Sequence, residues 1–455
     1  MKKITKGSLR RRLALGAAGA RSGAGILSSH AFSLLLAKDQ RQTHTDQALE
    51  REAKRFVKQL GDLKGAYVKI GQMLALYGEH LLPRPITQAL HTLESQTTPI
   101  DWTAIAPVLQ QSTDANNFDD LTIEEQAFAA ASLSQVHKAI LTNDKALDLC
   151  LKIQYLDIAD TIDDDFNNVM HMLKLGRWID SVQQVEIFTD DLKTKLLLEI
   201  DYRHELSQAR RMAKLLADDK RYLVPIYYDQ YCSSNILTMD FVDGLDVTDK
   251  RVQALSQERR NRLASAMLEL FFKEAFEWGL MQTDPNFGNY RIKIDPKGRN
   301  DRLVLLDFGA VHDLEKEFSQ ALQKTILAAH FNKIEATIEG LIELKCLRLS
   351  DTPEVKDSFA QFCNFILEPF SSDLSTLPEY AVSKGRYDWQ GSKLLKRAGK
   401  RGSKGMFVKG FSIPPPEFML MVRKLTGVFT FFSAIGAKTN SAVLLEKYAG
   451  DSDLI

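Results

Sequence analysis

Two stretches in the second half of the chain limit what it can fold into: MQTDPNFGNYRIKID at residues 281–295 and RLVLLDFGAV at residues 302–311. In the first, Asp284 and Asn289 are separated by four residues, and an alternating run of apolar and polar residues follows them. A turn containing proline and glycine then leads to an apolar strand that runs directly into the Asp-Phe-Gly of residues 307–309. Two strands around such a turn predict a β-hairpin, which stands between a D-x4-N loop and a DFG.

Phosphoryl transfer uses this arrangement, because the divalent cation that bridges the phosphates is held by oxygen ligands from separate loops. Asp307 and Asn289 are the residues that we assign to the metal. Asp284 is placed to orient or deprotonate an attacking hydroxyl or water. An isolated DFG arises by chance, whereas the ordered combination of D-x4-N, hairpin and DFG is specific. The expected cofactors are therefore ATP or ADP with Mg2+.

The segment that should contact the phosphates lies upstream. Residues 128–139 predict a strand, a turn of small residues and a second strand, and residues 147–154 predict an apolar strand ending at Lys152. In protein kinases a glycine-rich loop covers the phosphates and a lysine of the third strand contacts them. Here Ala129, Ala130 and Ala131 occupy the loop. Because alanine has a Cβ, it lets the backbone approach phosphate less closely, so nucleotide is expected to bind differently from its position in a protein kinase. The residues predicted to bind it here are Ala129, Ala130, Ala131, Ser132 and Lys152.

The lysine needs an acidic partner, and residues 196–212 predict one helix that carries Glu199, Asp201 and Glu205. Glu199 and Asp201 are two positions apart and splay on a helix, while Glu205 lies one to two turns farther on. Without the kinase-like series around them, these three acids would be a solvated helix face.

Residues 234–244 predict a strand that ends at Asp240 and continues through Val242. This is where a kinase-like hinge would offer backbone groups to adenine, so Asp240 and Val242 are predicted to bind the nucleotide.

A helix is predicted for residues 66–83, and it is apolar on both sides. Such a helix is usually covered on both sides. Lys69 and Gln72 stand on a face with apolar neighbours, so Lys69 requires a partner.

Six motifs in order resemble those of the UbiB/AarF family of atypical protein-kinase-like proteins, which includes mitochondrial proteins of coenzyme Q biosynthesis. They are KIGQ at 69–72, AAAS at 129–132, the lysine strand at Lys152, EID at 199–201, QTDPNFGN at 282–289 and DFG at 307–309. The loop reads Gln282-Thr283-Asp284, where many bacterial members have His-x-Asp, and so resembles the eukaryotic branch.

The resemblance implies an α+β protein with a two-lobed protein-kinase-like fold, an N-terminal helical extension over the active site and a helical C-terminal region. The expected parts are a basic segment at 1–40, flexible or in contact with a membrane, the helical extension with the K-x-G-Q motif at 41–115, the N-lobe at 116–245, and the C-lobe with C-terminal helices at 246–455.

By matching positions, the resemblance implies a role for each acid of the predicted helix. Lys69 would act as a plug that contacts Glu199 and Asp201 where a protein kinase admits peptide, so Lys69, Gln72, Glu199 and Asp201 are expected to be regulatory. Glu205 would pair with Lys152, and Asp284, Lys152 and Glu205 form the expected catalytic group.

The activity implied is nucleotide binding with ATP hydrolysis, linked to isoprenoid quinone biosynthesis or membrane-lipid metabolism. Protein phosphorylation is not expected, because the peptide site is blocked. The partners expected are nucleotide and a lipid or quinone-pathway intermediate. Two alternatives stay open: a nucleotide-gated scaffold without enzymatic turnover, and a kinase that acts on a small molecule or lipid.

Charge and cysteine content restrict the remaining possibilities. Lys plus Arg equals Asp plus Glu, so the chain gives no general argument for nucleic-acid binding. Four scattered cysteines without a CxxC pair indicate free thiols and no zinc site. Residues 1–38 are basic and free of acids, which is compatible with a targeting peptide, contact with a membrane surface or a disordered start.

The MKKI start resembles a bacterial member. The expected location is the cytoplasm, with peripheral contact at a bacterial inner membrane, and the alternative is the mitochondrial matrix face. The apolar run 425–437 is too short to cross a bilayer as a helix and predicts a buried C-terminal helix.

Overall fold

The computed structural model describes residues 38–63, 65–77, 82–95, 99–112, 118–142, 147–175, 178–179, 182–284, 286–405 and 414–449. The predictions made for 1–37, for residue 285 of the D-x4-N loop and for residues 78–81 of the predicted helix 66–83 lie outside these residues. Within the described residues the chain forms two compact units, Met1–Ser207 with Ile226–Phe241 and Gln208–Pro225 with Val242–Ile455. The sequence-based domain boundaries stay predictions.

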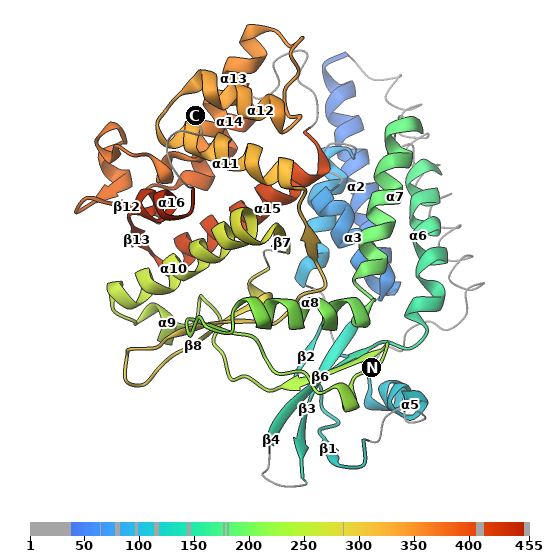
Figure 1. The fold of residues 1–455 in the computed structure, drawn as a ribbon. Helices are drawn as coiled ribbons and strands as arrows, with labels where there is room; N and C mark the ends of the chain where they lie inside the picture. Colours follow the sequence, from blue (N-terminus) through green and yellow to red (C-terminus); the bar gives the residue numbers. More distant parts are fainter. Residues whose placement is uncertain are drawn as a thin grey trace. The chain divides into compact units, whose positions relative to one another are not determined.

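The first unit contains one antiparallel sheet in the order β1-β3-β4-β6, with β2 paired to β3 (Figure 1). Alternate residues of β4 are fully buried, namely Leu149, Leu151 and Ile153, which is the period of two expected of a strand with one face on a core. The strands are β1 Leu121–Ile123, β2 Ala129–Ala130, β3 Ser134–Leu141, β4 Leu147–Gln154 and β6 Ile236–Asp240. The predicted strands at 147–154 and before residue 240 are confirmed.

Helices make up most of the remaining described residues of the first unit. They are α2 Lys38–Leu63, α3 Ala66–Tyr77, α4 Arg84–Leu90, α5 Trp102–Ser112, α6 Ile158–Leu175, α7 Val182–Leu198 and the start of α8 Tyr202–Leu215, with short 3-10 turns η1 His91–Ser95 and η2 Asp229–Tyr231. Helix α3 contacts α2, α4, α6 and α7, and Figure 1 shows α2, α3, α6 and α7 side by side. Between Ala66 and Ala75 every residue is buried except Lys69 and Gln72. The prediction that this helix is covered on both sides is confirmed.

Close packing explains the glycine of the KIGQ motif. A Cβ built on Gly71 would stand 2.4 Å from the Cδ1 atom of Leu93, which is fully buried in η1. A side chain at position 71 would therefore push α3 and η1 apart.

The second unit contains the predicted hairpin. Strands β8 Tyr290–Lys293 and β9 Arg302–Leu305 pair antiparallel, and β5 Tyr222–Leu223 adds to β9 in parallel. The turn between β8 and β9 closes on Asp295, whose side chain accepts backbone N–H bonds from Lys297, Arg299 and Asn300. The hairpin prediction is confirmed.

Other elements of this unit surround the hairpin. The strands are β7 Leu280–Gln282 paired with β10 Val311–Asp313, and the small sheet of β11 Val382–Ser383, β12 Arg386–Asp388 and β13 Lys438–Thr439. The helices are α9 Lys250–Gln253, α10 Gln257–Phe272, α11 Lys316–His330, α12 Ile334–Glu343, α13 Pro353–Ile366, α14 Leu394–Gly405, α15 Pro416–Ile435 and α16 Ser441–Ala449. Helix α10 continues into a π-helical turn, η3 Lys273–Trp278, and the short 3-10 turns are η4 Phe287–Asn289, η5 Glu368–Phe370, η6 Leu374–Thr376 and η7 Glu379–Ala381.

Helix α15 is longer than the predicted run 425–437. It begins at Pro416, because a proline is favoured at the first helical position, where its missing N–H has no intrahelical partner. Among the described helices it is the one whose length and composition would suffice to cross a membrane. Half of its apolar stretch is buried inside the unit, and it packs on α10. The argument that this run is too short to cross a bilayer was wrong, because the helix has 20 residues, and the interpretation as a buried C-terminal helix stays a prediction.

Candidate functional site

A short loop of the second unit, residues 283–289, carries Asp284 and Asn289. It connects the end of β7 to the start of β8. The Nδ2 atom of Asn289 donates a hydrogen bond to Oδ2 of Asp284 at 2.8 Å. Because the nitrogen of the amide group is used in this bond, Oδ1 is the atom of Asn289 that is suited to a cation. The turn before Asn289 is stabilised by the side chain of Asn286, which accepts the N–H of Gly288 at 2.9 Å.

The DFG follows β9 and reaches the same end of the hairpin. The N–H of Leu306 donates to the carbonyl of Asn289 at 3.0 Å. Asp307, the next residue in the chain, therefore follows a residue that is bonded to the end of the loop. The carboxylate of Asp307 accepts the N–H of Gly309 at 3.0 Å, and Phe308 is buried. The hairpin thus brings Asp284, Asn289 and Asp307 to one end of β8 and β9.

Helix α15 supplies two basic residues that the sequence interpretation missed, one in contact with this loop and one with residues on either side of it. Arg423 donates to Oδ1 of Asp284 at 2.9 Å. Lys424 lies 2.8 Å from Oε2 of Glu274 and 3.2 Å from the hydroxyl of Tyr290. The signal that could have revealed them is a pair of basic residues inside an otherwise apolar helix, where a cation requires a partner.

The pair of Lys424 and Glu274 is almost fully buried, with side chains 2% and 1% exposed. Burial disfavours the charged ammonium, but Glu274 and Tyr290 more than offset it, so the pKa of Lys424 lies above its usual range. Burial raises the pKa of Glu274, against the opposing effect of Lys424.

In the first unit, Lys152 and Glu205 are joined. The Nζ atom of Lys152 lies 2.8 Å from both carboxylate oxygens of Glu205. Glu205 stands in the first turn of α8 and is 2% exposed. Lys152 lies inside β4, which continues to Gln154, so the prediction that the strand ends at the lysine was wrong.

The motif EID does not lie on a helix. Helix α7 ends at Leu198 and α8 begins at Tyr202, so the single helix predicted for 196–212 was wrong. The break occurs because Asp201 caps α8, with its Oδ1 accepting the N–H of His204 at 3.0 Å. The Nζ atom of Lys69 lies 2.5 Å from Oε1 of Glu199 in this turn.

Gln72, the second polar residue of the KIGQ helix, makes a contact of a different kind. Its Nε2 donates to the carbonyl of Leu93 at 3.1 Å. This bond joins α3 to η1, next to the close contact of Gly71.

Two of the three alanines predicted in a loop belong to a strand instead. Ala129 and Ala130 form β2 and pair with Val136 and Gln135 of β3, because a tight turn closes directly after them. The N–H of Ala131 donates to the carbonyl of Ser134 at 2.8 Å, which closes that turn around Ser132.

At the predicted hinge, Asp240 ends β6 and Val242 follows in the second unit. The carboxylate of Asp240 accepts bonds from the hydroxyl of Tyr228 at 2.8 Å and from the N–H of Ile226 at 3.3 Å. Burial and the bond to Asp240 raise the pKa of Tyr228 to about 12. The side chain of Asp240 is therefore bonded to Ile226 and Tyr228, which precede β6. The backbone of Asp240 is the part of this residue that could bond an adenine base.

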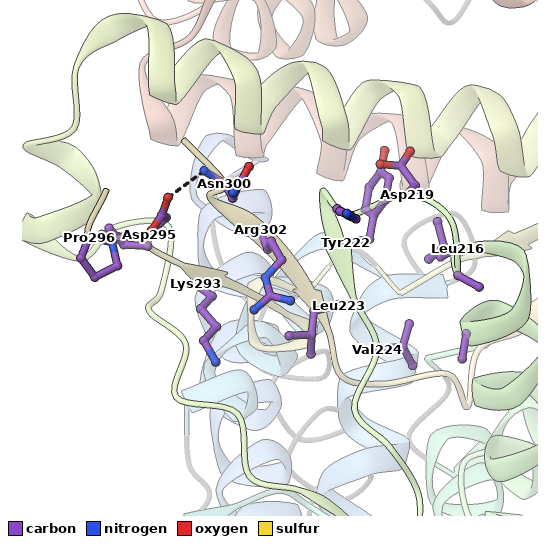
Figure 2. Close-up of a pocket in the computed structure, with 14 residues that line it drawn as sticks. Leu216, Asp219, Tyr222, Leu223, Val224, Lys293, Asp295, Pro296, Asn300 and Arg302 are labelled. Carbon is purple, nitrogen blue, oxygen red and sulfur yellow. Dashed lines mark hydrogen bonds between the residues drawn. The ribbon is translucent and has the colours of Figure 1, made fainter. Parts of the chain in front are cut away.

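Two pockets of about 610 and 650 Å3 are lined by residues of the second unit. Figure 2 shows the first, with Lys293 and Arg302 of the hairpin, Leu223 beside Arg302, and Val224 and Leu216 farther to the right. None of the predicted site residues lines either pocket.

No group of three or more His, Cys, Asp or Glu residues gathers as a metal site in the described part of the chain. A cation at the hairpin end would therefore use the oxygens of Asn289 and Asp307 together with those of a ligand. Asp and Asn oxygens are the donors that Mg2+ prefers, so these two residues fit that ion.

The fold defines a protein-kinase-like protein. The chain superposes on the structure titled the complex of Rv3197 with erythromycin from Mycobacterium tuberculosis with a TM-score of 0.60, over 90% of this chain and 98% of that one. The two sequences are 21% identical, so this likeness shows the fold alone.

Residues 92–339 match the ABC1 atypical kinase-like domain. The match covers more than half of the chain, and the chain belongs to this family of atypical kinase-like proteins, the UbiB family.

Similar curated proteins carry matching names. The chain is 28% identical to atypical kinase COQ8B, mitochondrial, of Rattus norvegicus over 84% of this chain and 68% of the relative. It is 28% identical to atypical kinase coq-8, mitochondrial, of Caenorhabditis elegans over 88% of this chain and 51% of the relative. It is 26% identical to atypical kinase COQ8, mitochondrial, of Saccharomyces cerevisiae over 89% of this chain and 76% of the relative.

Proposed function

We propose that this protein is an atypical kinase-like ATPase that binds a magnesium nucleotide. The family and the kinase-like fold support a nucleotide-dependent activity. The observation that carries the proposal is the convergence of Asp284, Asn289 and Asp307 at one end of the β8–β9 hairpin.

In this proposal one group of the predicted site residues contacts either the metal ion or a part of the nucleotide. Asn289 and Asp307 would hold Mg2+, which neutralises phosphate charge when it is bound. Lys152, fixed by the two bonds to Glu205, would contact the phosphates. The turn after β2 and the backbone at Asp240 and Val242 would bind the remainder of the nucleotide.

Asp284 would orient the attacking hydroxyl or water. Its two carboxylate oxygens are held separately, Oδ1 by Arg423 and Oδ2 by Asn289, so the plane of the group is set before a substrate arrives. A catalytic group held in one orientation contributes more than a mobile one, because proton transfer needs hydrogen-bond geometry.

Lys69 would regulate access. Its ammonium bonds Glu199 in the turn between α7 and α8, and its helix is covered on both sides. The resemblance to the UbiB family implies that the KIGQ helix occupies the position that a peptide substrate would need, and this implication argues against protein phosphorylation.

The pathway proposed is isoprenoid quinone or membrane-lipid metabolism, on the resemblance to the UbiB family. Three relatives are named mitochondrial, which favours the matrix face over the bacterial inner membrane as the location.

Magnesium-dependent ATP turnover tests the proposal directly. Asp307→Asn should abolish turnover in a folded protein, while Asp357→Asn, on an exposed position of α13, should leave it unchanged. Equal turnover in the Asp307 variant and the wild type would refute the assignment.

A second comparison separates the enzyme from a nucleotide-gated scaffold. Asp284→Asn should fail to replace the wild type in a cell that lacks the protein. A scaffold without turnover would tolerate this change.

A further inference from the structure

Two neighbouring residues of α15 contact the loop 283–289 and its support. Arg423 bonds the carboxylate of Asp284 inside the loop at 2.9 Å. Lys424 bonds Glu274 of the π-helical turn at 2.8 Å, away from the loop itself. One turn of α15 thus contacts both the carboxylate of Asp284 and the π-helical turn η3, which precedes β7.

Lys424 is also connected to both ends of the loop. Its ammonium donates to the hydroxyl of Tyr290, the first residue after the loop, at 3.2 Å. The same hydroxyl donates to Oε1 of Gln282, the last residue before the loop, at 2.7 Å. The span of the loop is therefore fixed by a buried chain of three side chains.

Burial of the Lys424–Glu274 pair has a desolvation cost in free energy. A buried ion pair gains little over apolar residues of similar volume, because desolvation of both charges offsets their attraction. The π-helical turn that carries Glu274 is a second irregularity, of a kind that often marks functional sites. Packing alone would be served as well by apolar side chains at 274 and 424.

Arg423 is also linked to Asn289 through Asp284. It donates to Oδ1 of Asp284, and Oδ2 of the same carboxylate accepts from the amide of Asn289, which lies 3.5 Å from the backbone carbonyl of Asp284 as well. The guanidinium therefore contacts the carboxylate that the amide of Asn289 uses for its shorter bond.

We propose that α15 positions the active-site loop through Arg423 and Lys424. Arg423 orients Asp284 and Asn289, and Lys424 sets the distance between the two ends of the loop that carries them. This inference rests on the proposed function for its catalytic part. Both are positioning residues, and both lie outside the segment 92–339 that matches the family domain.

Hydrogen exchange without nucleotide tests the positioning. The amides of Gly288 and Asn289 donate to Asn286 within the loop, and that of Thr283 donates to the carbonyl of Ala310, at 2.9 Å each. Arg423→Ala should speed their exchange about tenfold, as expected when a local opening becomes easier, while Arg423→Lys should restore part of the protection. Unchanged exchange in Arg423→Ala would overturn the proposal.

Arg260→Ala is the matched control. Arg260 bonds the carbonyl of Ile435 at the end of α15 at 2.8 Å and does not contact the loop. This variant should loosen the end of the helix and leave the exchange of the loop amides as in the wild type. Equal acceleration by both variants would reduce the effect to general loosening of α15 and overturn the specific role.

Steady-state kinetics tests the catalytic part. Arg423→Ala should lower kcat for ATP about 10- to 100-fold with little change in KM, since a misplacement of about 1 Å can cost about 100-fold. Faster loop exchange with an unchanged kcat would contradict that part. If the wild type itself shows no turnover, the proposed function fails, and the exchange experiment still decides whether α15 positions the loop.

Discussion

Removal of the ammonium from the buried Lys424–Glu274 pair should destabilise the second unit in a way that depends on pH. Lys424→Met keeps an unbranched side chain, shorter by the ammonium nitrogen, and leaves the Glu274 carboxylate buried without its cation. Breaking a buried pair in this way costs about 3–5 kcal/mol when the remaining group stays charged.

Protonation limits the loss, and the limit can be worked out. Glutamate in water titrates near about 4.3, and each pH unit above that value costs about 1.36 kcal/mol to keep it protonated. The expected loss of unfolding free energy is therefore about 4 kcal/mol at pH 7 and about 1 kcal/mol at pH 5. The sign follows from the raised pKa of Glu274, because a carboxyl that binds its proton more tightly in the folded state loses stability as pH rises.

Urea unfolding of wild type and variant at pH 5, 6 and 7 gives this difference directly. The control is the double variant Glu274→Gln/Lys424→Met, in which neither residue of the pair can ionise and the difference from wild type should vary little with pH. A loss that is the same at pH 5 and pH 7, or below about 1 kcal/mol at pH 7, would refute the reasoning.

Three further outcomes follow from single sites. Gly71→Ala should cost about 1–3 kcal/mol by overpacking against Leu93, and Leu93→Val should relieve part of it in the double variant, as thermal unfolding can measure. Asp201→Ala should cost about 1 kcal/mol through loss of the α8 cap while Asp201→Asn retains most of it, and equal losses in urea unfolding would contradict the cap. His137 is buried, and burial holds its pKa below the usual value. The stability that neutral His137 contributes is therefore present above about pH 6.5 and is lost as pH falls below that value. His137→Asn should remove this pH dependence.

The hairpin and the sheet could be predicted because their signals are local. An alternating run, a turn with Pro and Gly and an apolar run specify β8 and β9 without reference to other parts of the chain. The burial of α3 was predictable for the same reason, since its own residues are apolar on both sides.

The break between α7 and α8 was missed because helix propensity does not reveal a cap. Residues 196–212 are good helix formers, but Asp201 gains a bond to the N–H of His204 only if a new helix starts after it. The carboxylates of Glu199 and Glu205 are consequently presented by a turn and by a helix start rather than by one continuous face.

The partners of Arg423 and Lys424 could not be predicted from local patterns. Their partners Asp284 and Glu274 lie more than a hundred residues earlier in the chain, and a single sequence does not show which buried cation meets which acid. What the sequence does show is that a lysine in a buried helix must have a partner.

The central claim is that the protein binds a magnesium nucleotide through Asp307. Isothermal titration calorimetry of ATP into the full chain, with Mg2+ and then with EDTA, measures it for the wild type, Asp307→Asn and the control Asp357→Asn. The account predicts magnesium-dependent binding that the Asp307 variant loses and the Asp357 variant keeps. Binding that is unaffected by EDTA and by Asp307→Asn, or no binding by the wild type, would contradict it.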